Sequence, residues 1–334
     1  MTSQLRIGVL GAARIAPSAL IRPAERVPEA VVTAVAARDP ERARAFAVKH
    51  RIPVVHASYQ DLLDDKEIDA VYNPLPNALH AEWTLRALEA GKHVLCEKPF
   101  TANAAEAATV AAAAKASGLV VMEAFHYRYH PLAERMREIV AGGELGGLRS
   151  VEVSMCFPLP LFGDIRYRYD LGGGALMDGG CYALHCLRLL GQGTPEVLSA
   201  RATLRSPDID RAMTAELRFP GGASGRITAS MWSHRLLDFT ARVVGESGEL
   251  RITNYLAPHI WNRLTVRTPA GTRRERVHGG PTYGYQLRAF TEAVLHGGPV
   301  LTPAEDAVVT MGLIDDIYRA AGMRPRGETP TPQV

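Results

Sequence analysis

The sequence predicts an α/β protein in which a doubly wound parallel sheet is followed by an α+β domain with a large, mainly antiparallel open sheet. The chain has 334 residues, more than the roughly 250–300 residues at which a single hydrophobic core stops growing. Its first third alternates short apolar runs with helical patterns, which is typical of parallel strands covered on both faces. Beyond residue 123, segments of alternating polarity follow one another without intervening helices, which favours antiparallel strands.

The first domain, residues 1–123, is defined by its apolar runs and the helices between them. These runs predict the strands Leu5–Leu10, Val31–Ala37, Val54–His56, Ile68–Tyr72, His93–Cys96 and Leu119–Met122. Helical patterns predict Pro40–His50, Asn77–Ala90 and Asn103–Ser117. Six strands with five connections suit a dinucleotide-binding (Rossmann) domain.

The second domain, residues 124–323, is expected to be built mainly from one sheet. Its predicted strands are Arg149–Phe157, Glu196–Leu204, Met213–Phe219, Ala223–Trp232, Phe239–Val244, Glu249–Thr253 and Leu264–Thr268. Its predicted helices are His130–Gly142, Ala175–Leu190, Tyr283–Leu295 and Pro303–Ala321. Residues 324–334 are rich in Pro and Thr and are expected to form a loose tail.

Composition excludes several classes of protein. The 38 Lys and Arg against 35 Asp and Glu leave a net charge of +3, too small for a nucleic-acid or membrane-surface footprint. No apolar run approaches the length of a membrane span, and the first residues lead into a strand without a secretory leader. The four cysteines show no disulfide spacing, so we expect reduced thiols and a cytoplasmic location. Cys181, His185 and Cys186 lack a second ligand pair, so no metal site is expected.

A glycine turn follows the first strand. It reads Gly11-x-Ala13-x-x-Ala16, with Arg14 and Ile15 between the alanines, where a dinucleotide fingerprint is G-x-G-x-x-G/A. Gly11 permits a tight turn, and the helix start beyond it can hold a phosphate. The same pattern also occurs in ordinary strand-to-helix turns, so the motif alone does not decide the matter.

Charges after the second strand distinguish the two nicotinamide cofactors. NAD enzymes usually place a carboxylate there for the ribose hydroxyls. This chain has Arg38 and Arg42, whose guanidinium groups suit a 2′-phosphate. The prediction is therefore NADP(H), while Asp39 keeps NAD(H) possible.

Three further motifs carry a family resemblance. They are Asn73-Pro-Leu-Pro-Asn77-Ala-Leu-His80, Cys96-Glu97-Lys98-Pro99 and Gly172-Gly-Gly-Ala-Leu-Met-Asp178-Gly-Gly-Cys-Tyr182. In this order and spacing the chain resembles the Gfo/Idh/MocA oxidoreductases over nearly its whole length. Gly163-Asp-Ile-Arg166-Tyr167 and Tyr182 make it most similar to the dimeric dihydrodiol dehydrogenases, NADP-dependent xylose dehydrogenases and sugar ketoreductases.

The resemblance implies reversible hydride transfer between nicotinamide and a carbinol of a sugar, cyclitol or vicinal diol. Lys98 matches the lysine that contacts both the reacting oxygen and the nicotinamide ribose of the cofactor, and Tyr182 stands where much of the family has a proton-donating histidine. Asp178 precedes Tyr182 by one helical turn and is expected to orient the substrate or to keep Lys98 charged. His185, on the same helical stripe, remains the alternative proton donor.

Further expected cofactor and substrate contacts complete the site. The cofactor would also contact Pro74, Leu75, Asn77, His80, Glu97, Arg166 and Tyr283. Arg128 and Trp232 would face the substrate, although Trp232 fits an oligomer interface equally well. The resemblance further implies a homo-oligomer, most simply a dimer through the open sheet, because a monomer is expected to expose a large apolar surface on the uncovered face. Two other functions stay open, a glycosidase that uses nicotinamide transiently and a non-catalytic nucleotide-binding regulator.

Overall fold

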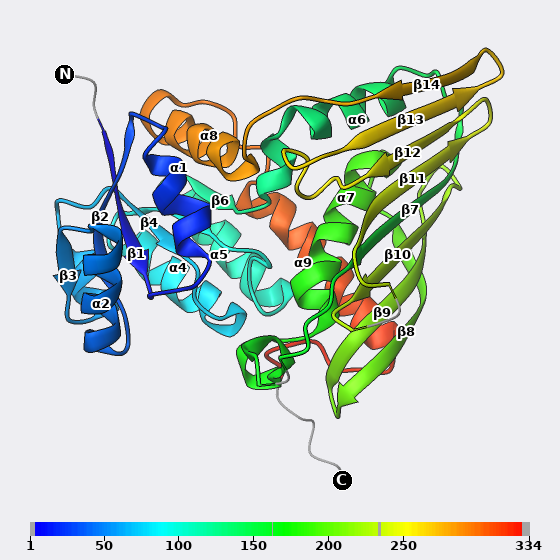
Figure 1. Cartoon of the computed structure of the whole chain (residues 1–334). Coiled ribbons are helices and arrows are strands. Elements are labelled where there is room, and N and C mark those ends of the chain that lie inside the picture. The colour runs from blue at the N-terminus through cyan, green and yellow to red at the C-terminus, as the bar shows by residue number, and fades with distance from the viewer. Residues whose placement is uncertain (1–3, 162, 233–234, 329–334) are drawn as a thin grey trace, which may run out of the picture. The chain divides into compact units, whose positions relative to one another are not determined.

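The computed structural model describes residues 4–161, 163–232 and 235–328, which form two compact units (Figure 1). The first unit contains the described chain through Thr101, with Ala105–Tyr129 and Gly280–Val308. The second contains Ala102–Ala104, the described residues of His130–Gly279, and the described chain from Val309 onward. A single boundary at residue 123 therefore does not reproduce this division, because a later segment returns to the first unit.

The first unit is built on a six-stranded parallel sheet. Its strands are β1 (Leu5–Leu10), β2 (Ala30–Ala36), β3 (Val54–His56), β4 (Ala70–Asn73), β5 (His93–Cys96) and β6 (Val121–Glu123), in the order β3-β2-β1-β4-β5-β6. All five pairings are parallel, which confirms the predicted Rossmann sheet. The order reverses between β1 and β4, so the loops after these strands open at the point where such sheets bind ligands.

The first unit also contains helices. They are the π-helix η1 (Pro17–Ile21), α1 (Arg22–Ala24), α2 (Pro40–His50), α3 (Tyr59–Asp64), η2 (Asn77–Leu79), α4 (His80–Glu89), α5 (Ala104–Ser117), η3 (His126–Tyr129) and α8 (Thr282–His296). The predicted helix Asn77–Ala90 is thus a 3-10 turn followed by an α-helix. The short α3 was not predicted.

Helix α8 belongs to the first unit rather than to the second domain where the sequence placed it. Its Leu287 and Phe290 are fully buried in the same hydrophobic cluster as Ile7 and Val9 of β1. An amphipathic pattern predicts that a helix has a buried face but does not say which core receives that face. Only the folded chain decides that partner.

The second unit contains an eight-stranded sheet. Its strands are β7 (Leu148–Cys156), β8 (Glu196–Ser206), β9 (Ile209–Arg218), β10 (Ser224–Ser230), β11 (Asp238–Gly245), β12 (Glu249–Thr253), β13 (Arg263–Thr268) and β14 (Gly271–Glu275). They lie in the order β14-β13-β12-β11-β7-β10-β9-β8, and β7 with β10 is the one parallel pair recorded within the described part of this sheet. The predicted antiparallel sheet is confirmed. The missed strand, β14, has no apolar side chain and lies at an exposed edge.

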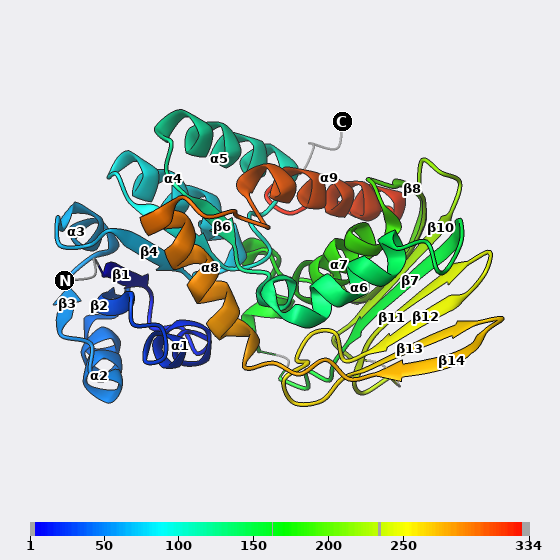
Figure 2. The same cartoon turned by 90° about the horizontal axis from the view of Figure 1, so that it is seen from above.

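Helices cover one face of this sheet. They include α6 (Pro131–Ala141), the π-helix η6 (Leu176–Gly180), α7 (Cys181–Gly191) and, from Val309, the helix α9 (Ala304–Ala320); the short 3-10 turns η4 (Ile165–Tyr167) and η5 (Tyr169–Leu171) precede η6. Figure 2 shows α6, α7 and α9 on the same side of the strands. The covered face buries apolar side chains such as Val153, Ile227 and Ala241.

The opposite face of the sheet is polar, contrary to the large apolar surface expected for an open sheet. One row across five strands is entirely hydroxylic: Thr214, Thr228, Ser154, Thr240 and Thr253. The next row is charged and contains the ion pair of Arg226 with Glu216 at 2.6 Å; from the same row Arg242 reaches Glu249, one row further along, at 2.7 Å. Strict alternation along the strands separates these residues from the apolar face.

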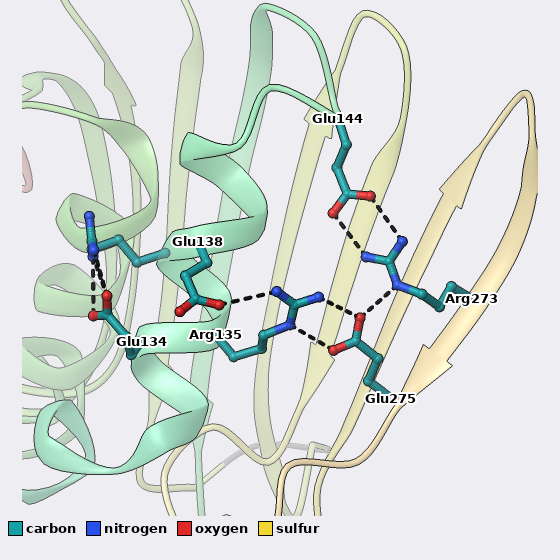
Figure 3. A network of polar contacts seen from close by, with 7 residues as sticks. Glu134, Arg135, Glu138, Glu144, Arg273 and Glu275 are labelled. Carbon is teal, nitrogen blue, oxygen red and sulfur yellow. Dashed lines mark hydrogen bonds and ion pairs between the residues drawn. The ribbon is translucent and has the colours of Figure 1, made fainter.

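A charged network ties α6 to β14 (Figure 3). Arg135 on α6 makes two hydrogen bonds to Glu275 on β14, at 2.8 and 2.9 Å, and a third to Glu138 at 3.1 Å. Arg273 binds the same Glu275 at 2.6 Å and pairs with Glu144 at 2.9 and 3.0 Å. The two arginines hold the pKa of Glu275 at about 2, chiefly through the hydrogen bond from Arg135.

The described part of the expected loose tail, residues 324–328, is held in place. Arg326 is fully buried and pairs with Asp210 at 2.9 Å. Arg324 pairs with Asp208 at 2.7 Å, and Tyr169 donates a hydrogen bond to the carbonyl oxygen of Pro325 at 2.8 Å. The composition predicted a loose tail because Pro and Thr residues contribute little to a hydrophobic core. In the folded chain Arg326 instead forms a buried ion pair with Asp210, which is distant in the sequence. Residues 329–334 lie outside the described part of the chain.

Candidate active site

The turn after β1 has the geometry that a bound phosphate requires. Gly11 adopts a positive φ of 93°, and its N–H donates to the carbonyl oxygen of Ala36 at 2.6 Å. A Cβ on Gly11 would lie 3.1 Å from Leu75 Cδ2, so only glycine leaves this turn undisturbed. The helix begins at once with η1, while Arg14 and Ile15 remain exposed beside the turn. The loop therefore fits the pyrophosphate of a dinucleotide.

The two arginines after β2 are arranged differently from the aspartate between them. Asp39 is the N-cap of α2, where its Oδ1 accepts from the N–H groups of Glu41 at 3.0 Å and Arg42 at 3.3 Å. Arg42 donates from Nη2 to the carbonyl oxygen of Ala12 at 3.0 Å, which fixes its charge beside the glycine turn. Arg38 is exposed. The carboxylate has a structural task here, while positive charge borders the place for a ribose phosphate.

The loop after β4 is held from behind by His80. This ring is fully buried, and its nitrogens lie 2.7 Å from the carbonyl oxygen of Leu75 and 2.8 Å from that of Pro99. Burial lowers the pKa of His80 to about 4. The sequence led us to expect a cofactor contact; the ring instead lies between the backbones of the two loops that carry Leu75 and Lys98, and as a neutral imidazole it donates a hydrogen bond to one of the two carbonyl oxygens. Pro74 and Leu75 are buried and Asn77 is half-buried in the same loop.

The end of β5 presents Glu97 and Lys98. The Tyr72 hydroxyl donates to Glu97 Oε1 at 2.7 Å, and the Lys98 N–H donates to Glu97 Oε2 at 3.3 Å. Tyr72 is fully buried, and desolvation together with the Glu97 charge raises the pKa of its phenol well above the ordinary value. Glu97 is thereby fixed in orientation, while the Lys98 side chain is half-buried at the carboxyl edge of the sheet.

Helix α8 brings Tyr283 to the same unit. Its ring lies 4.2 Å from that of His126, centroid to centroid. Tyr283 also packs against the hydrophobic cluster that contains Tyr72. Arg128, on η3, is half-buried. The placement of α8 in the first unit thus puts Tyr283 near the Glu97 end of the sheet.

In the second unit Asp178 is paired with Arg166. Arg166 Nε lies 2.9 Å from Asp178 Oδ2, and Arg166 Nη1 lies 3.2 Å from Asp164 Oδ1. Asp164 also accepts from the Arg166 N–H at 3.0 Å as the N-cap of η4. The charge of Asp178 is the main cause that raises the pKa of the Arg166 guanidinium. Two predicted residues that lie 12 positions apart are thereby brought together.

Tyr182 and His185 lie on α7, which follows η6 directly. Tyr182 is 4% exposed and His185 is 5% exposed. Gly180 permits this close packing, because a Cβ there would lie 2.7 Å from Leu176 Cδ1 and 3.3 Å from the Cβ of Ala229 on β10. The predicted helix Ala175–Leu190 is therefore present, but its first turn, which carries Asp178, is π-helical.

Other residues near these groups were not singled out by the sequence. Asn73 is fully buried and donates from Nδ2 to the His80 carbonyl oxygen and to Thr84 Oγ1, both at 3.2 Å. Asp164 pairs with Arg166 and lies in the motif Gly163-Asp-Ile-Arg166-Tyr167, but it was not predicted as a site residue. Nothing local distinguishes Asp210 or Arg326. Trp232 is 40% exposed, next to Leu236 and Leu237 at one end of the sheet.

A glycine turn after the first strand, arginines after the second and a lysine at the end of the fifth are features expected of a dinucleotide-dependent oxidoreductase, and the first unit contains all three. The chain belongs to the Gfo/Idh/MocA family. The family model described as "Oxidoreductase family, NAD-binding Rossmann fold" matches residues 5–125, and the model of the family's C-terminal domain matches residues 133–251. Among the described residues no cluster of His, Cys, Asp or Glu could hold a metal ion.

Curated relatives cover most of the chain. A D-xylose 1-dehydrogenase (NADP(+)) of Haloferax volcanii is 38% identical over 95% of this chain and 97% of its own length. A dTDP-3,4-didehydro-2,6-dideoxy-alpha-D-glucose 3-reductase of Streptomyces violaceoruber is 38% identical over 88% of this chain and 86% of its own. A trans-1,2-dihydrobenzene-1,2-diol dehydrogenase of Mus musculus is 36% identical over 66% and 68%, respectively.

Solved structures show the same architecture. A 3-ketoreductase from Actinomadura kijaniata, in complex with NADP and TDP-benzene, has a TM-score of 0.88 at 31% identity and covers 96% of this chain and 98% of its own. Structures of that enzyme include variants with a tyrosine replaced by phenylalanine and with a lysine replaced by alanine. In the part of the chain that the structure describes, no helix has the length and hydropathy of a membrane span.

Proposed function

We propose that this protein is an NADP(H)-dependent oxidoreductase that moves a hydride between nicotinamide and a carbinol or ketone of a sugar, cyclitol or vicinal diol. The observation that carries the proposal is the end of β5, where Glu97 is fixed by Tyr72 and Lys98 follows it at the carboxyl edge of a parallel sheet. Open α/β sheets bind their ligands at this edge. The named activities of the relatives belong to the same reaction class.

The preference for NADP(H) rests on Arg38 and Arg42. Arg42 is anchored on Ala12, and Arg38 is exposed beside it, so a 2′-phosphate would meet two guanidinium groups. Asp39 already accepts two backbone hydrogen bonds as an N-cap and is less available to ribose hydroxyls. NAD(H) is the weaker cofactor in this proposal.

Each proposed catalytic group has one task. Bound nicotinamide supplies or accepts the hydride. The Lys98 ammonium stabilises negative charge on the substrate oxygen, and the Tyr182 hydroxyl gives that oxygen its proton in the reducing direction. Asp178, fixed by Arg166, accepts a hydrogen bond from a neighbouring substrate hydroxyl and orients the carbinol. The reverse direction uses the same groups with the proton returned to Tyr182.

A cofactor-absorbance screen at about 340 nm tests the function. Wild-type chain would be offered NADPH with 3-keto sugars and NADP⁺ with pentoses, hexoses, inositols and trans-dihydrodiols, with the Lys98→Met variant as the control. We expect turnover with at least one class of substrate and its loss in the variant. Cofactor that binds but never exchanges, together with cleavage of a glycoside, would instead indicate the glycosidase. Tight cofactor binding without any turnover would favour the regulator.

We further propose a cytoplasmic homo-oligomer, most simply a two-fold dimer through the uncovered face of the eight-stranded sheet. The hydroxyl and charged rows of this face offer self-complementary hydrogen bonding across a two-fold axis. The exposed Leu236, Leu237, Ile260 and Trp261 lie in the two loops at one end of the same sheet. The balanced composition and the free cysteines are consistent with a reducing compartment.

A further inference from the structure

The C-terminal segment 324–328 contacts the loop that precedes η6 and α7, which carry Asp178 and Tyr182. Arg326 is fully buried, and its Nε donates to the Gly173 carbonyl oxygen at 2.6 Å. Its Nη2 donates to Asp210 Oδ1 at 2.9 Å and lies 3.0 Å from the Tyr318 hydroxyl. The guanidinium plane also covers the Tyr318 ring, 4.1 Å from its centroid. Each of these contacts lies within the second unit.

The same network grips the loop on both sides of Gly174. Arg326 holds the carbonyl of Gly173, while the second oxygen of Asp210 accepts the N–H of Leu176 at 2.7 Å. Gly174 has a φ of 136°, and a Cβ there would overlap Asp210 Oδ1 and lie 2.7 Å from Arg326 Nη2. The backbone is therefore shaped around the buried ion pair, with glycine at the point of closest approach.

The held residues lead directly to Asp178. The Gly174 N–H donates to the Arg166 carbonyl oxygen at 2.8 Å, and the Asp178 N–H donates to the Gly174 carbonyl oxygen at 3.0 Å. Arg166 in turn pairs with the Asp178 carboxylate at 2.9 Å. Gly174 is thus bonded to both members of the pair, so any movement of Gly174 would displace both Arg166 and Asp178.

We propose that segment 324–328 is a clamp on the π-helical turn that carries Asp178, and that Arg326 and Asp210 are positioning residues for the reaction. The expected loss of kcat rests on the proposed function, whereas the expected change in amide exchange around Asp178 does not. The tail touches neither substrate nor cofactor in this proposal. It acts by keeping the Arg166–Asp178 pair in one orientation, and misplacement of a positioned group by about 1 Å can lower a rate roughly 100-fold.

The test compares Arg326→Ala with Arg324→Ala in the full chain. The two arginines share one segment, but Arg326 alone of the two bonds Gly173 and Asp210 through its side chain. The Arg324 side chain pairs with Asp208 and lies over the Tyr169 ring, 4.9 Å from its centroid, while its backbone oxygen accepts from Arg326 Nη1 at 3.2 Å. We expect Arg326→Ala to lower kcat by about 10- to 100-fold and to speed amide exchange in residues 172–180. Binding of 2′,5′-ADP, a probe without nicotinamide, should stay unchanged. Arg324→Ala leaves the bonds of Arg326 to Gly173 and Asp210 in place, so its effects on kcat and on exchange should be much smaller than those of Arg326→Ala.

Chemical rescue separates positioning from general damage. Added guanidinium ion can occupy the space left by Arg326→Ala, and it should slow the exchange of residues 172–180 and restore part of kcat, with no gain for Arg324→Ala. If Arg326→Ala fails to fold, Arg326→Lys replaces it, because lysine keeps the charge but lacks the planar fork that places Nε on Gly173 and Nη2 on Asp210 and covers the Tyr318 ring. Wild-type kcat and wild-type exchange in either Arg326 variant would overturn the clamp. If the wild-type chain turns over no substrate in the screen, the proposed function fails, while the exchange measurement still decides the clamp.

Discussion

Three charged residues that follow β2 have different tasks. Asp39 caps a helix, Arg42 binds the glycine turn, and Arg38 points its charge to solvent. Helix capping by a side-chain oxygen is worth about 1 kcal/mol, so Asp39 is retained for the fold. The guanidinium groups are then the ones left to choose the cofactor.

We expect Arg38→Ala to weaken NADPH binding by about 1.5–3 kcal/mol, the usual effect of losing a charged hydrogen bond, and to leave NADH nearly unaffected. Fluorescence titration with both cofactors measures the difference. The matched control is Arg44→Ala on α2, because Arg44 is exposed and pairs with Glu41 of the same helix. Equal losses for NADPH and NADH would remove the assignment of Arg38.

Lys98 and Tyr182 are expected to act on one oxygen. Lys98→Met and Tyr182→Phe should each lower kcat by roughly 10²–10⁴ while NADPH binding stays nearly intact, which is the scale of one acid–base or electrostatic group. Because the two groups act as a unit, the double variant should lose much less than the product of the single losses. Steady-state kinetics and cofactor titration measure both effects.

The alternative proton donor provides the contrast. The limb of the pH profile that belongs to Tyr182 should vanish in Tyr182→Phe and shift in Lys98→Met. His185→Ala should retain turnover. An active Tyr182→Phe beside an inactive His185→Ala would transfer the proton-donor role to His185.

At the scale of elements, both π-helices of the described chain stand at the expected site. One, η1, follows the glycine turn, and the other, η6, carries Asp178. Wider helical turns of this kind are rare and are frequent at functional sites. They were invisible to the sequence analysis, because the same apolar spacing is compatible with an α-helix.

The link between α6 and β14 should depend on acid. Glu275 has a folded pKa of about 2, below the ordinary value of 4.5, so its contribution to stability is present above pH 4.5 and is lost as the pH falls toward 2. Because the paired arginines are partly exposed to solvent, we expect Glu275→Gln to lower the free energy of unfolding by only roughly 1–2 kcal/mol at pH 7. The difference from wild type should shrink below about pH 3. Urea unfolding at both pH values measures it.

Glu134 offers the matched control for this experiment. It lies on the same helix, but it pairs with Arg137 at the surface, with both side chains nearly half exposed. Glu134→Gln should change the unfolding free energy by less than about 0.5 kcal/mol. If Glu275→Gln behaves in the same way at pH 7, the α6–β14 network contributes nothing to stability.

At the scale of the whole molecule, we expect light scattering to find twice the chain mass of 36.2 kDa. Thr228 lies in the middle of the hydroxyl row, between Thr214 and Ser154. Thr228→Arg should therefore separate the dimer into monomers by preventing face-to-face contact. Thr272→Arg, on the exposed edge strand β14, should leave the dimer intact. A 36.2 kDa wild-type particle at micromolar concentration would contradict the dimer.

Much of the fold was predictable because its signals are local. β1, β3, β5, β12 and α2 begin and end at the predicted residues, since each is a short apolar run or a capped amphipathic segment. β14 was missed because it has no buried face. The turn η6, which precedes α7, was predicted to be α-helical but is π-helical. The glycine turn, Arg38 and Lys98 were found from motifs, but the motifs do not say what each side chain touches.

The sequence by itself determined the two sheets, the family and the chemical groups available to the site. Tertiary structure alone decided that α8 joins the first core, that Asp178 faces Arg166, and that His80 ties two loops from behind. It also decided that Arg326 meets Asp210, which is 116 residues away along the chain. Periodicity and capping are properties of a few consecutive residues, whereas a buried charge takes whichever partner the completed fold brings within reach.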